Sequence, residues 1–599
     1  MIYHCEDHTC NYWDEGEKLP ERCPQCGRKL LRANEADMTG DDWTALGNTL
    51  WYAEASDKKR MVDCFRKAAY LGSAWGVCNL GICMEQGNGV EADPVQAFWL
   101  YRQAVEMGSL NAVCCLGVCY QYGIGTAPDA EKAAELYCKA AEYGSPRGQM
   151  LLARAFHDGI GVEADAAEAV HWVRAAAYQR YGEGMHRLGV CYAYGDGVEQ
   201  NWEHAVHWFR EAAESGVSVA MADLGYCYEK GCGVEQSWEQ AFSWYRRGAE
   251  CGYPVSMSNL GLCYKRGYGV EQNWQEAIKW YEQGAQCGDL QSMHNLACCY
   301  ERGEGVEQNE ERALYWYRRS AEGGNGVAMC NLGWCYQRGY GVEQNEDRAL
   351  YWYRRGAEAG SDYCMYCLGW NYSNGEGVEQ NMTEAIRWYT AAAEGGNADA
   401  MHNLGWHYDH GEGVEQDMKK AICWYERAAE QNHPAAMNSL GECYAMGRGV
   451  PRDLETAMEW YRRAAELGEA MADYNMGWHL EQAGKLSEAY AHYRKAADGN
   501  DDSAWWALGR FYENGVVVAQ DGKEARRCYE TGEKLGSVKC KMRLARCKLL
   551  GIGGRREKKA GLDLCRQALE LAKESSEKED YGYEAEMNLL RRTIAENES

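Results

Sequence analysis

The feature that most constrains this chain is a Leu-Gly or Leu-Ala pair that recurs every 36 residues. The leucines of the regular series are Leu80, Leu116, Leu152, Leu188, Leu224, Leu260, Leu296, Leu332, Leu368, Leu404 and Leu440. Leu46, Met476, Leu508 and Leu544 extend it, with less regular spacing, to fifteen copies. A fixed period of this length indicates stacked repeats, and 599 residues exceed what a single hydrophobic core usually contains.

Each repeat carries two apolar helical faces separated by a glycine-containing connection, as residues 218–253 illustrate. The first half places its apolar side chains on one face of a helix: Ala220, Met221, Leu224, Cys227 and Tyr228. The second half does so with Ala241, Trp244, Tyr245 and Ala249. We expect Gly231 and Gly233 to end the first helix, because glycine adopts the backbone angles of a helix C-terminus. The repeat therefore predicts two antiparallel helices that cover their apolar faces only when the next repeat stacks on them.

Small residues in both halves predict close packing of the helices. We expect Gly225 and Ala241 to let two helices approach while Trp244 and Tyr245 fill the space beside them. Tryptophan recurs at the position of Trp244 in most repeats, at Trp99, Trp172, Trp208, Trp280, Trp316, Trp352, Trp388, Trp424 and Trp460. A column at the repeat period is typical of a core, so we predict that these tryptophans are buried.

The stretches AMADLGYCYEKGCGVEQ and AFSWYRRGAECG, echoed by AMHNLGWHYDHGEGVEQ and AICWYERAAE, resemble the Sel-one-like repeat family, a relative of the tetratricopeptide repeats. The resemblance covers residues 42–575. It implies an all-α, right-handed superhelical solenoid of about fifteen antiparallel helix pairs whose first helices line the concave side. It also implies a role in assembling or recruiting other proteins. The connection is mostly GVEQ, whereas the family's proline-containing form survives only at Gly449–Asp453.

The net charge indicates which kind of partner to expect, and the cysteine positions indicate which cellular compartment. The formal charge of −27 disfavours binding to nucleic acid and would attract a basic partner. The dominant cysteine column lies three residues after the anchor leucine, with no regular partner column, which is typical of small buried thiols in a reducing cytosol. The sequence shows neither a secretory signal pattern nor 18 consecutive apolar residues. We therefore expect a cytoplasmic chain, monomeric and without a membrane span.

Residues 1–32 do not follow the repeat and predict a zinc-ribbon-like or rubredoxin-like module. Cys23-Pro-Gln-Cys26-Gly27 is the recurrent half-site of such modules, and Cys5 and Cys10 complete four thiolates for structural zinc. His4 or His8 could replace one of these thiolates, and the alternatives are a redox or disulfide pair and unligated thiols. Residues 33–41 read as a linker, residues 42–575 as the solenoid and residues 576–599 as a C-terminal capping helix.

Aromatic side chains follow the anchor leucine by two residues in several repeats, off the core-facing positions of the first helix. They are Tyr226, Trp334, Trp370, Trp406 and Trp478, and the helically adjacent column adds His294, Tyr366 and His402. Exposed aromatics in a line are typical of a peptide-binding groove. The alternative is that they pack against the neighbouring repeat as large core residues, and the sequence leaves both open.

Two charged patterns have a structural and a binding interpretation. Glutamate recurs in the connections, where it would accept amide hydrogen bonds at a helix N-terminus or form an acidic strip for a basic partner: Glu163, Glu199, Glu235, Glu271, Glu307, Glu343, Glu379 and Glu415. A basic cluster near the C-terminus is either a solvated helix pair or a docking patch: Lys541, Arg543, Arg546, Lys548, Arg555, Arg556, Lys558 and Lys559.

No phosphate-binding loop, nucleophile elbow or H-E-x-x-H motif is present, so we predict that the protein is not an enzyme. The leading hypothesis is a scaffold that binds a protein or peptide in the solenoid groove. The alternative is a zinc-dependent regulator whose N-terminal module contacts nucleic acid or a catalytic partner.

The cysteine spacing makes the metal content testable. We expect one zinc ion per chain by elemental analysis of the full-length protein, and less than one tenth of that in Cys23→Ser/Cys26→Ser, because two of four thiolates are removed. Cys423→Ser, outside the module, serves as the control. Equal zinc in all three proteins would contradict the assignment.

Overall fold

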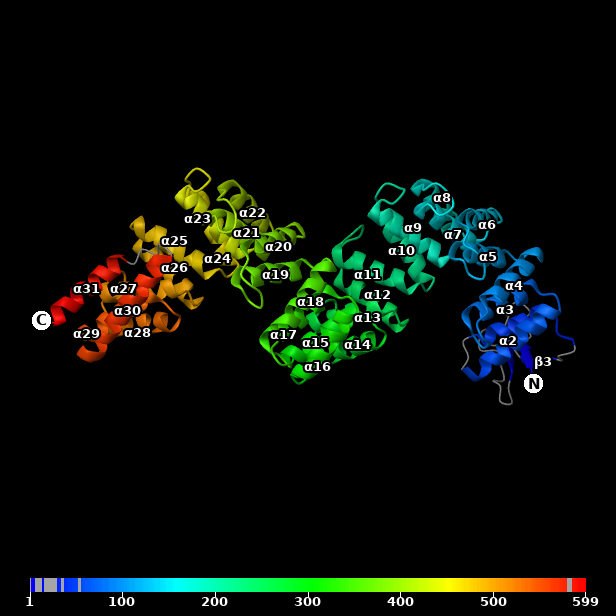
Figure 1. Cartoon of the computed structure of the whole chain (residues 1–599), viewed down its shortest axis with the longest axis horizontal. Helices are drawn as coiled ribbons and strands as arrows, with labels where there is room; N and C mark the ends of the chain where they lie inside the picture. The colour runs from blue at the N-terminus through cyan, green and yellow to red at the C-terminus, as the bar shows by residue number, and fades with distance from the viewer. Residues whose placement is uncertain are drawn as a thin grey trace. The chain divides into compact units, whose positions relative to one another are not determined.

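The computed structural model describes residues 2–5, 13–15, 30–33, 37–51, 55–578 and 584–598, with side chains for residues 37–51, 57–573 and 584–597. Within these residues it contains thirty-one helices and three strands. The chain divides into two compact units, residues 1–308 and 309–599, each of which is described by itself (Figure 1). The predicted α-helical repeat architecture is confirmed in both units.

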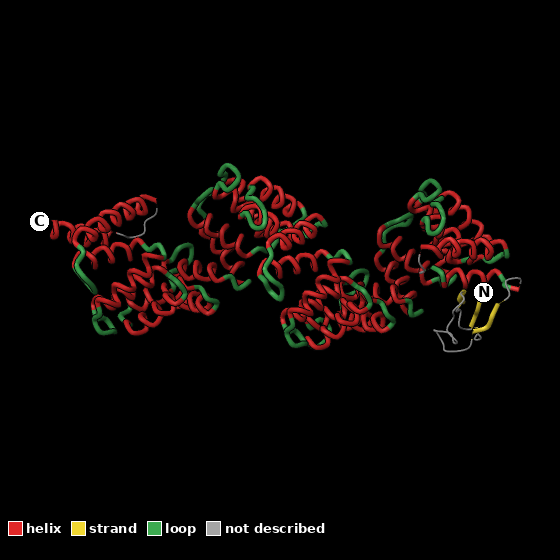
Figure 2. Tube along the Cα trace, turned by 90° about the horizontal axis from the view of Figure 1, so that it is seen from below, coloured by secondary structure: helices red, strands yellow, loops and turns green. Residues whose placement is uncertain are grey.

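The first unit begins with three short strands and continues with helices that alternate in direction. The strands are β1 (Ile2–Cys5), β2 (Trp13–Glu15) and β3 (Leu30–Ala33), an antiparallel sheet in the order β2-β1-β3. The odd-numbered helices are α1 (Gly40–Thr49), α3 (Ala74–Gln86), α5 (Leu110–Tyr122), α7 (Pro146–Asp158), α9 (Gly182–Tyr194), α11 (Ser218–Lys230), α13 (Pro254–Arg266) and α15 (Leu290–Arg302). The even-numbered helices are α2 (Ala55–Tyr70), α4 (Pro94–Glu106), α6 (Ala130–Glu142), α8 (Ala166–Tyr178), α10 (Trp202–Glu214), α12 (Trp238–Glu250) and α14 (Trp274–Gln286). Strand β2 contacts α1, so the sheet lies against the first helix pair (Figure 2).

The second unit is helical throughout its described residues. Its odd-numbered helices are α17 (Gly326–Arg338), α19 (Asp362–Asn374), α21 (Ala398–His410), α23 (Pro434–Met446), α25 (Ala470–Gln482), α27 (Asp502–Asn514) and α29 (Val538–Leu550). Its even-numbered helices are α16 (Glu310–Glu322), α18 (Glu346–Glu358), α20 (Met382–Glu394), α22 (Met418–Glu430), α24 (Leu454–Glu466), α26 (Leu486–Asp498), α28 (Gly522–Lys534) and α30 (Lys558–Lys578). Helix α31 (Glu584–Glu598) follows them.

Within each unit the odd-numbered helices form an inner layer. Several successive odd-numbered helices contact each other, as α17 contacts α19 and α27 contacts α29, whereas described contacts between successive even-numbered helices are sparser. We call the two sets the inner and outer helices.

The connections depend on two glycines in the predicted positions. Gly231 ends α11 with φ 73°, and its N–H donates to the carbonyl of Cys227. Gly233, also at positive φ, lies against the backbone of α10, where an added Cβ would be 2.3 Å from the carbonyl oxygen of Trp202. The first glycine therefore closes the helix, and the second lets the loop touch the preceding repeat.

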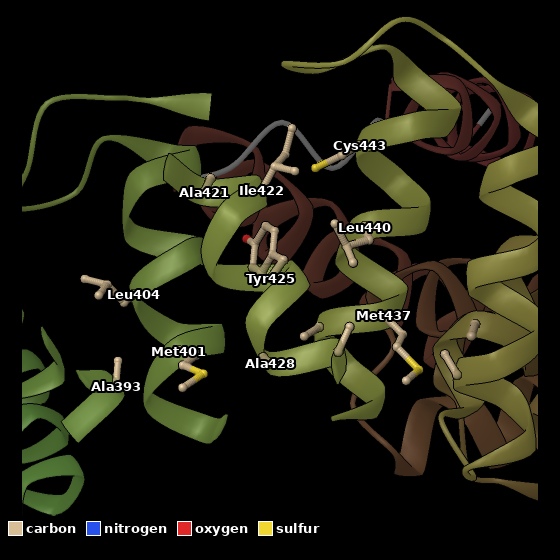
Figure 3. Packing of buried hydrophobic residues seen from close by; sticks show 14 of the residues in the cluster. Ala393, Met401, Leu404, Ala421, Ile422, Tyr425, Ala428, Met437, Leu440 and Cys443 are labelled. Carbon is tan, nitrogen blue, oxygen red and sulfur yellow. The ribbon is translucent and has the colours of Figure 1, made fainter. Parts of the chain in front are cut away.

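The core of a repeat is built on a glycine that faces an aromatic ring. A Cβ added to Gly225 would lie 2.6 Å from the ring of Tyr245, closer than any side-chain carbon can approach. The contact recurs as Gly81–Tyr101, Gly117–Tyr137, Gly189–Phe209, Gly261–Tyr281, Gly333–Tyr353, Gly369–Tyr389, Gly405–Tyr425, Gly441–Tyr461, Gly477–Tyr493 and Gly509–Tyr529. Figure 3 shows Tyr425 in such a core, with Leu404 and Leu440 from the flanking helices. The predicted close approach at Gly225 is confirmed.

The predicted core role of the tryptophan column is confirmed in part. Trp244 and Trp352 are 9% exposed, and most of the others are half-buried against the core clusters, whereas Trp99 is 57% exposed. Consecutive residues point about 100° apart around a helix, and the tyrosine takes the core-facing direction. The indole rings lie at its edge, where a cation covers several of them: the Arg247 guanidinium lies 4.3 Å from the centre of the Trp244 ring.

The cysteine column packs as predicted. The eight cysteines three residues after the regular anchor leucines are all buried: Cys83, Cys119, Cys191, Cys227, Cys263, Cys299, Cys335 and Cys443. Burial raises the pKa of Cys227 to about 12, so this thiol is neutral at physiological pH.

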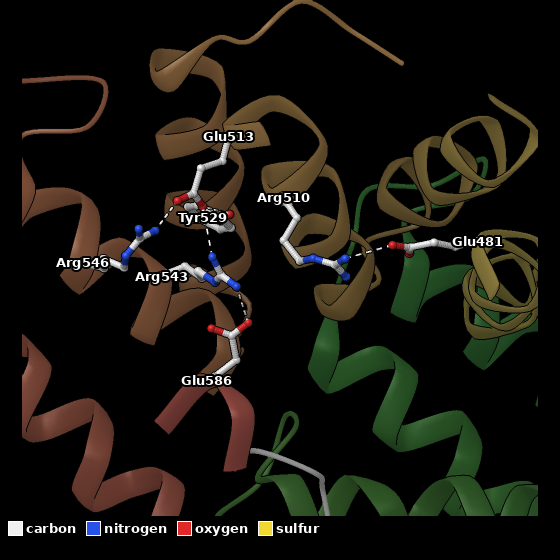
Figure 4. A network of polar contacts seen from close by, with 7 residues as sticks. All are labelled: Glu481, Arg510, Glu513, Tyr529, Arg543, Arg546 and Glu586. Carbon is white, nitrogen blue, oxygen red and sulfur yellow. Dashed lines mark hydrogen bonds and ion pairs between the residues drawn. The ribbon is translucent and has the colours of Figure 1, made fainter. Parts of the chain in front are cut away.

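Two residues of the basic cluster near the C-terminus form internal ion pairs, whereas Arg555, Arg556, Lys558 and Lys559 are exposed, so both interpretations given above stay open for these four. Arg543 and Arg546 both donate to the carboxylate of Glu513, and Arg543 also donates to Glu586 of α31 at 2.6 Å (Figure 4). Helix α31 packs on α29 and α30 and buries Leu590. Paired charges and apolar packing thus join the final helix to the last repeat.

No helix in the described part of the chain is long and apolar enough to cross a membrane.

Candidate functional site

A row of tryptophans follows the inner helices of the second unit. Trp334 on α17, Trp370 on α19 and Trp478 on α25 are 40%, 44% and 42% exposed, and Trp406 on α21 is half-buried. Trp334, Trp370 and Trp406 follow a Leu-Gly pair directly and Trp478 follows Met476-Gly477, so the glycine faces the tyrosine ring and the tryptophan lies beside it on the helix. The exposure of Trp334, Trp370 and Trp478 favours the groove interpretation over the core interpretation for these three residues.

Neighbouring aromatic rings hold two of these indoles. The Trp406 ring stacks on the His410 ring with centres 4.3 Å apart, and Nδ1 of His410 lies 2.9 Å from the Trp406 carbonyl oxygen. The Trp334 ring lies 5.6 Å from Tyr340 of the following connection. Rings that are already oriented lose little conformational entropy when a ligand covers them.

The second predicted column borders this row but is more deeply buried. Tyr366 packs against Tyr389, with ring centres 6.0 Å apart. The His402 ring stacks on His433 at 5.2 Å, and its Nε2 atom lies 3.4 Å from Oγ of Ser439. Burial, followed by the repulsion from His433, lowers the pKa of His402 to about 4, so this ring is neutral at physiological pH.

A carboxylate interrupts the row where α23 places Glu442. This side chain accepts hydrogen bonds from the amide groups of Asn438 and Asn475, at 3.1 and 3.2 Å. Burial raises the pKa of Glu442, and Arg448 lies 3.7 Å away and opposes that shift. The inner surface between Trp406 and Trp478 is thus polar and internally hydrogen-bonded.

Tyr226 and His294 belong to the first unit and are not part of this row. Tyr226 on α11 is exposed, with the Lys230 ammonium 5.9 Å from its ring centre. Burial lowers the pKa of His294, which bonds with Gln291 and Asn295 of its own helix. Tyr363, an exposed tyrosine beside Tyr366, is an aromatic residue of the inner surface that sequence analysis missed.

The loop glutamates do not cap helices. All eight, from Glu163 to Glu415, are exposed, and the described part of the chain shows no hydrogen bond or ion pair to their carboxylates. The residues that follow them take the expected role. In one connection Gln236 donates to the carbonyl of Glu229 at 2.8 Å, and Ser237 accepts from the N–H of Gln240 at the start of α12. The capping interpretation of these glutamates is wrong.

The predicted zinc ligands are outside what the structure describes. Cys5 is the last residue of β1, but its side chain and the whole of Cys10, Cys23 and Cys26 are not among the described residues. Across residues 37–51, 57–573 and 584–597, no three His, Cys, Asp or Glu side chains are grouped to hold a metal ion.

Comparison with known proteins decides the family. The Sel1 repeat model matches fourteen segments: residues 76–109, 112–145, 146–181, 182–217, 218–253, 254–289, 290–325, 326–361, 362–397, 398–433, 434–469, 470–501, 504–537 and 538–573. The chain belongs to the Sel1 repeat family. The resemblance seen in the sequence is thereby confirmed.

Two solved structures share about a third of their residues with this Sel1 repeat protein. It is 33% identical to c5321, a protective antigen present in uropathogenic Escherichia coli strains displaying an SLR fold, over 75% of this chain and 97% of that chain, with a TM-score of 0.48. It is 32% identical to a Sel1 repeat protein from Oxalobacter formigenes, over 41% of this chain and 96% of that chain, with a TM-score of 0.38. No curated protein sequence matches the chain.

The lowered pKa of His402 predicts a pH-dependent stability of the inner surface. Unfolded histidine takes up a proton near pH 6.5, whereas folded His402 does so only near pH 4, so stability falls as the pH drops through this interval. We expect His402→Gln to reduce that loss by up to about 3 kcal/mol, measured by urea unfolding at pH 7 and pH 4.5.

Two features of this experiment distinguish the acid response of His402 from that of neighbouring titratable groups. Asp399, 3.2 Å from His433, also loses a favourable interaction in acid, but it does so in both proteins and cancels in the comparison. The exposed His410 on the same helix, changed to glutamine, is the control and should keep the wild-type dependence. An identical acid response of wild type and His402→Gln would contradict the assignment.

Proposed function

We propose that this Sel1 repeat protein is an interaction scaffold that binds a protein or peptide along the inner helices of its second unit. The observation that carries the proposal is the row formed by Trp334, Trp370, Trp406 and Trp478. Three of these four expose 40% or more of their surface, although tryptophan is otherwise a highly buried residue. Sel1 repeat proteins generally act as protein-interaction scaffolds, and a large part of three of these indoles stays accessible for a partner.

The energetics favour a few aromatic anchors over an extended polar interface. Tryptophan is enriched among binding hot spots, where truncation costs about 2 kcal/mol or more, equivalent to roughly 30-fold in Kd. An extended or helical segment that covers Trp334 and Trp370 would bury two indoles on successive inner helices. Tyr366 and His402 would border the bound segment, because they are half-buried beside the row.

Charge supports a basic partner. The chain carries a formal charge of −27, and the second unit contributes three exposed loop glutamates, Glu343, Glu379 and Glu415, that make no intramolecular ion pair. Such charges raise the association rate of a cationic segment more than they raise its affinity. We place the protein in the cytoplasm as a non-enzymatic monomer with structural zinc in its first 32 residues. The cytoplasmic location is supported by the burial of most cysteines of residues 57–573, which is typical of small thiols in a reducing compartment.

An affinity experiment tests the proposal. We expect at least one protein captured by the wild-type chain from lysate of the source organism to be lost with Trp334→Ala/Trp370→Ala/Trp406→Ala, identified by mass spectrometry. Tyr315→Ala/Tyr351→Ala is the matched control, because both tyrosines are exposed aromatics on outer helices of the same unit. The far-UV helical signal should stay unchanged in both variants.

Two outcomes would contradict the proposal. Capture of the same proteins by the triple variant would exclude the tryptophan row as the binding surface. Unfolding of the triple variant, with the outer control still folded, would show that these indoles serve the core.

A further inference from the structure

The first unit contains a cavity that the proposed function does not use. Its volume is about 370 Å³, and it opens between inner helices α7 and α9 above outer helix α8. Its floor is apolar and buried, formed by Ala153, Val173 and Cys191 among others, and charged side chains surround its mouth. This volume lies within the range of small-molecule sites, roughly 300–1,000 Å³.

The cavity exists because this repeat lacks the core tyrosine. Val173 occupies the position that Tyr137, Tyr245 and Tyr281 hold in other repeats, and those tyrosines are at most 1% exposed. The residue twenty positions earlier, glycine in those repeats, is Ala153 here. The ring has been removed from the space between two inner helices, and an added Cβ fills only a small part of it.

The equivalent tyrosines also show which side chain bonds with the hydroxyl at the polar end of that space. Their hydroxyls donate to the side chain sixteen residues earlier, at 2.7 Å from Tyr137 to Gln121, 2.9 Å from Tyr245 to Glu229 and 2.8 Å from Tyr529 to Glu513. In the next repeat the ring is Phe209, which has no hydroxyl, and the residue sixteen positions earlier is Ala193.

The repeat with the cavity keeps a polar group at the acceptor position although it has no hydroxyl of its own. The residue sixteen positions before Val173 is His157. Its Nδ1 atom lies 2.7 Å from Asp158, and its Nε2 atom lies 3.3 Å from Asp196. These carboxylates are paired in turn with Arg154 at 3.4 Å and Arg187 at 3.0 Å.

We propose that this cavity binds a 4-hydroxyphenyl group supplied from outside the chain. The ring takes the place that tyrosine fills in the other repeats, against Ala153 and Val173. The hydroxyl meets the polar group at His157, whose two carboxylate neighbours supply acceptors. The group can come from the tyrosine side chain of a partner protein or from a free phenol, because both carry the same ring and hydroxyl.

Fluorine NMR with 4-fluorophenol tests the proposal on the full-length protein. We expect saturable broadening of the ¹⁹F signal with a Kd on the order of 0.1–1 mM, the affinity typical of a ligand of this size. In Ala153→Gly/Val173→Tyr, which restores the glycine–tyrosine pair of the other repeats, binding should weaken at least ~10-fold because the new tyrosine fills the cavity.

The variants are chosen so that a folding defect cannot imitate the result. Val173→Tyr alone is avoided, because the Ala153 Cβ would meet the new ring as an added Cβ would at Gly117, 2.5 Å from the Tyr137 ring. Ala153→Gly alone is the control: the cavity stays open, and binding should remain within about twofold of wild type. The thermal midpoint of the double variant should equal or exceed that of wild type.

A comparison of ligands distinguishes the contribution of the ring from that of the hydroxyl. It also distinguishes a tyrosine side chain from a free phenol as the source of the group. Fluorobenzene should bind at least ~10-fold more weakly than 4-fluorophenol, because it has no hydroxyl to donate to the carboxylate acceptors beside His157. Displacement of 4-fluorophenol by N-acetyltyrosinamide would indicate a tyrosine side chain, and displacement by 4-hydroxyphenylacetate alone would indicate a free phenol. Absence of binding, equal binding of fluorobenzene, or undiminished binding to the double variant would overturn the proposal.

Discussion

The contact between a glycine of an inner helix and a tyrosine ring of the following outer helix is the constraint on which this structure depends. At Gly225 there is no room for even one carbon atom, since a Cβ would lie 2.6 Å from Tyr245. The ring fills the space between two inner helices, and in several repeats its hydroxyl is satisfied by a side chain of the first of them. One pair of residues thus fixes the helix spacing and supplies the buried polar contact.

The same contact explains why the inner surface presents side chains outward. Because leucine and glycine of each pair face the core and the ring, the next residue lies at the edge of the core: it is half-buried at Val118 and Val190 and exposed at Trp334 and Trp370. In the second unit that residue is tryptophan at Trp334, Trp370, Trp406 and Trp478. The proposed binding surface therefore follows from the geometry of the core.

Two departures from the pair change both members, whereas a third changes only the glycine. Where Ala153 replaces the glycine, the ring is reduced to Val173, and where Ala545 replaces it, the ring position holds Cys565. Both residues of the second pair are fully buried. Ala297 keeps a tyrosine at position 317, so the substitution of glycine alone does not require loss of the ring. The cavity beside Val173, between α7 and α9, therefore results from the loss of the ring and not from the loss of the glycine.

The 36-residue period was sufficient to predict the helix pairs, their glycine-ended first helices and the buried cysteine column, because each depends on local spacing. It could not predict which of two adjacent aromatics enters the core. Trp244 and Tyr245 differ by one position on the helix, and the choice depends on Gly225 across the interface. The role of the loop glutamates was also misjudged, since Ser237 accepts the amide N–H at the start of α12 that was expected to bond with Glu235. The cavity left a sequence signal, valine in the tyrosine column, whose meaning required the structure.

The central claim is tested most directly by a double-mutant cycle between Gly225→Ala and Tyr245→Val, followed by urea unfolding. Overpacking and cavity formation each cost about 1–5 kcal/mol. If the residues are coupled as the structure indicates, the double variant is more stable than the sum of the single changes predicts, by at least about 1 kcal/mol. Additive losses would contradict the claim that the glycine–tyrosine contact sets the spacing of the inner helices.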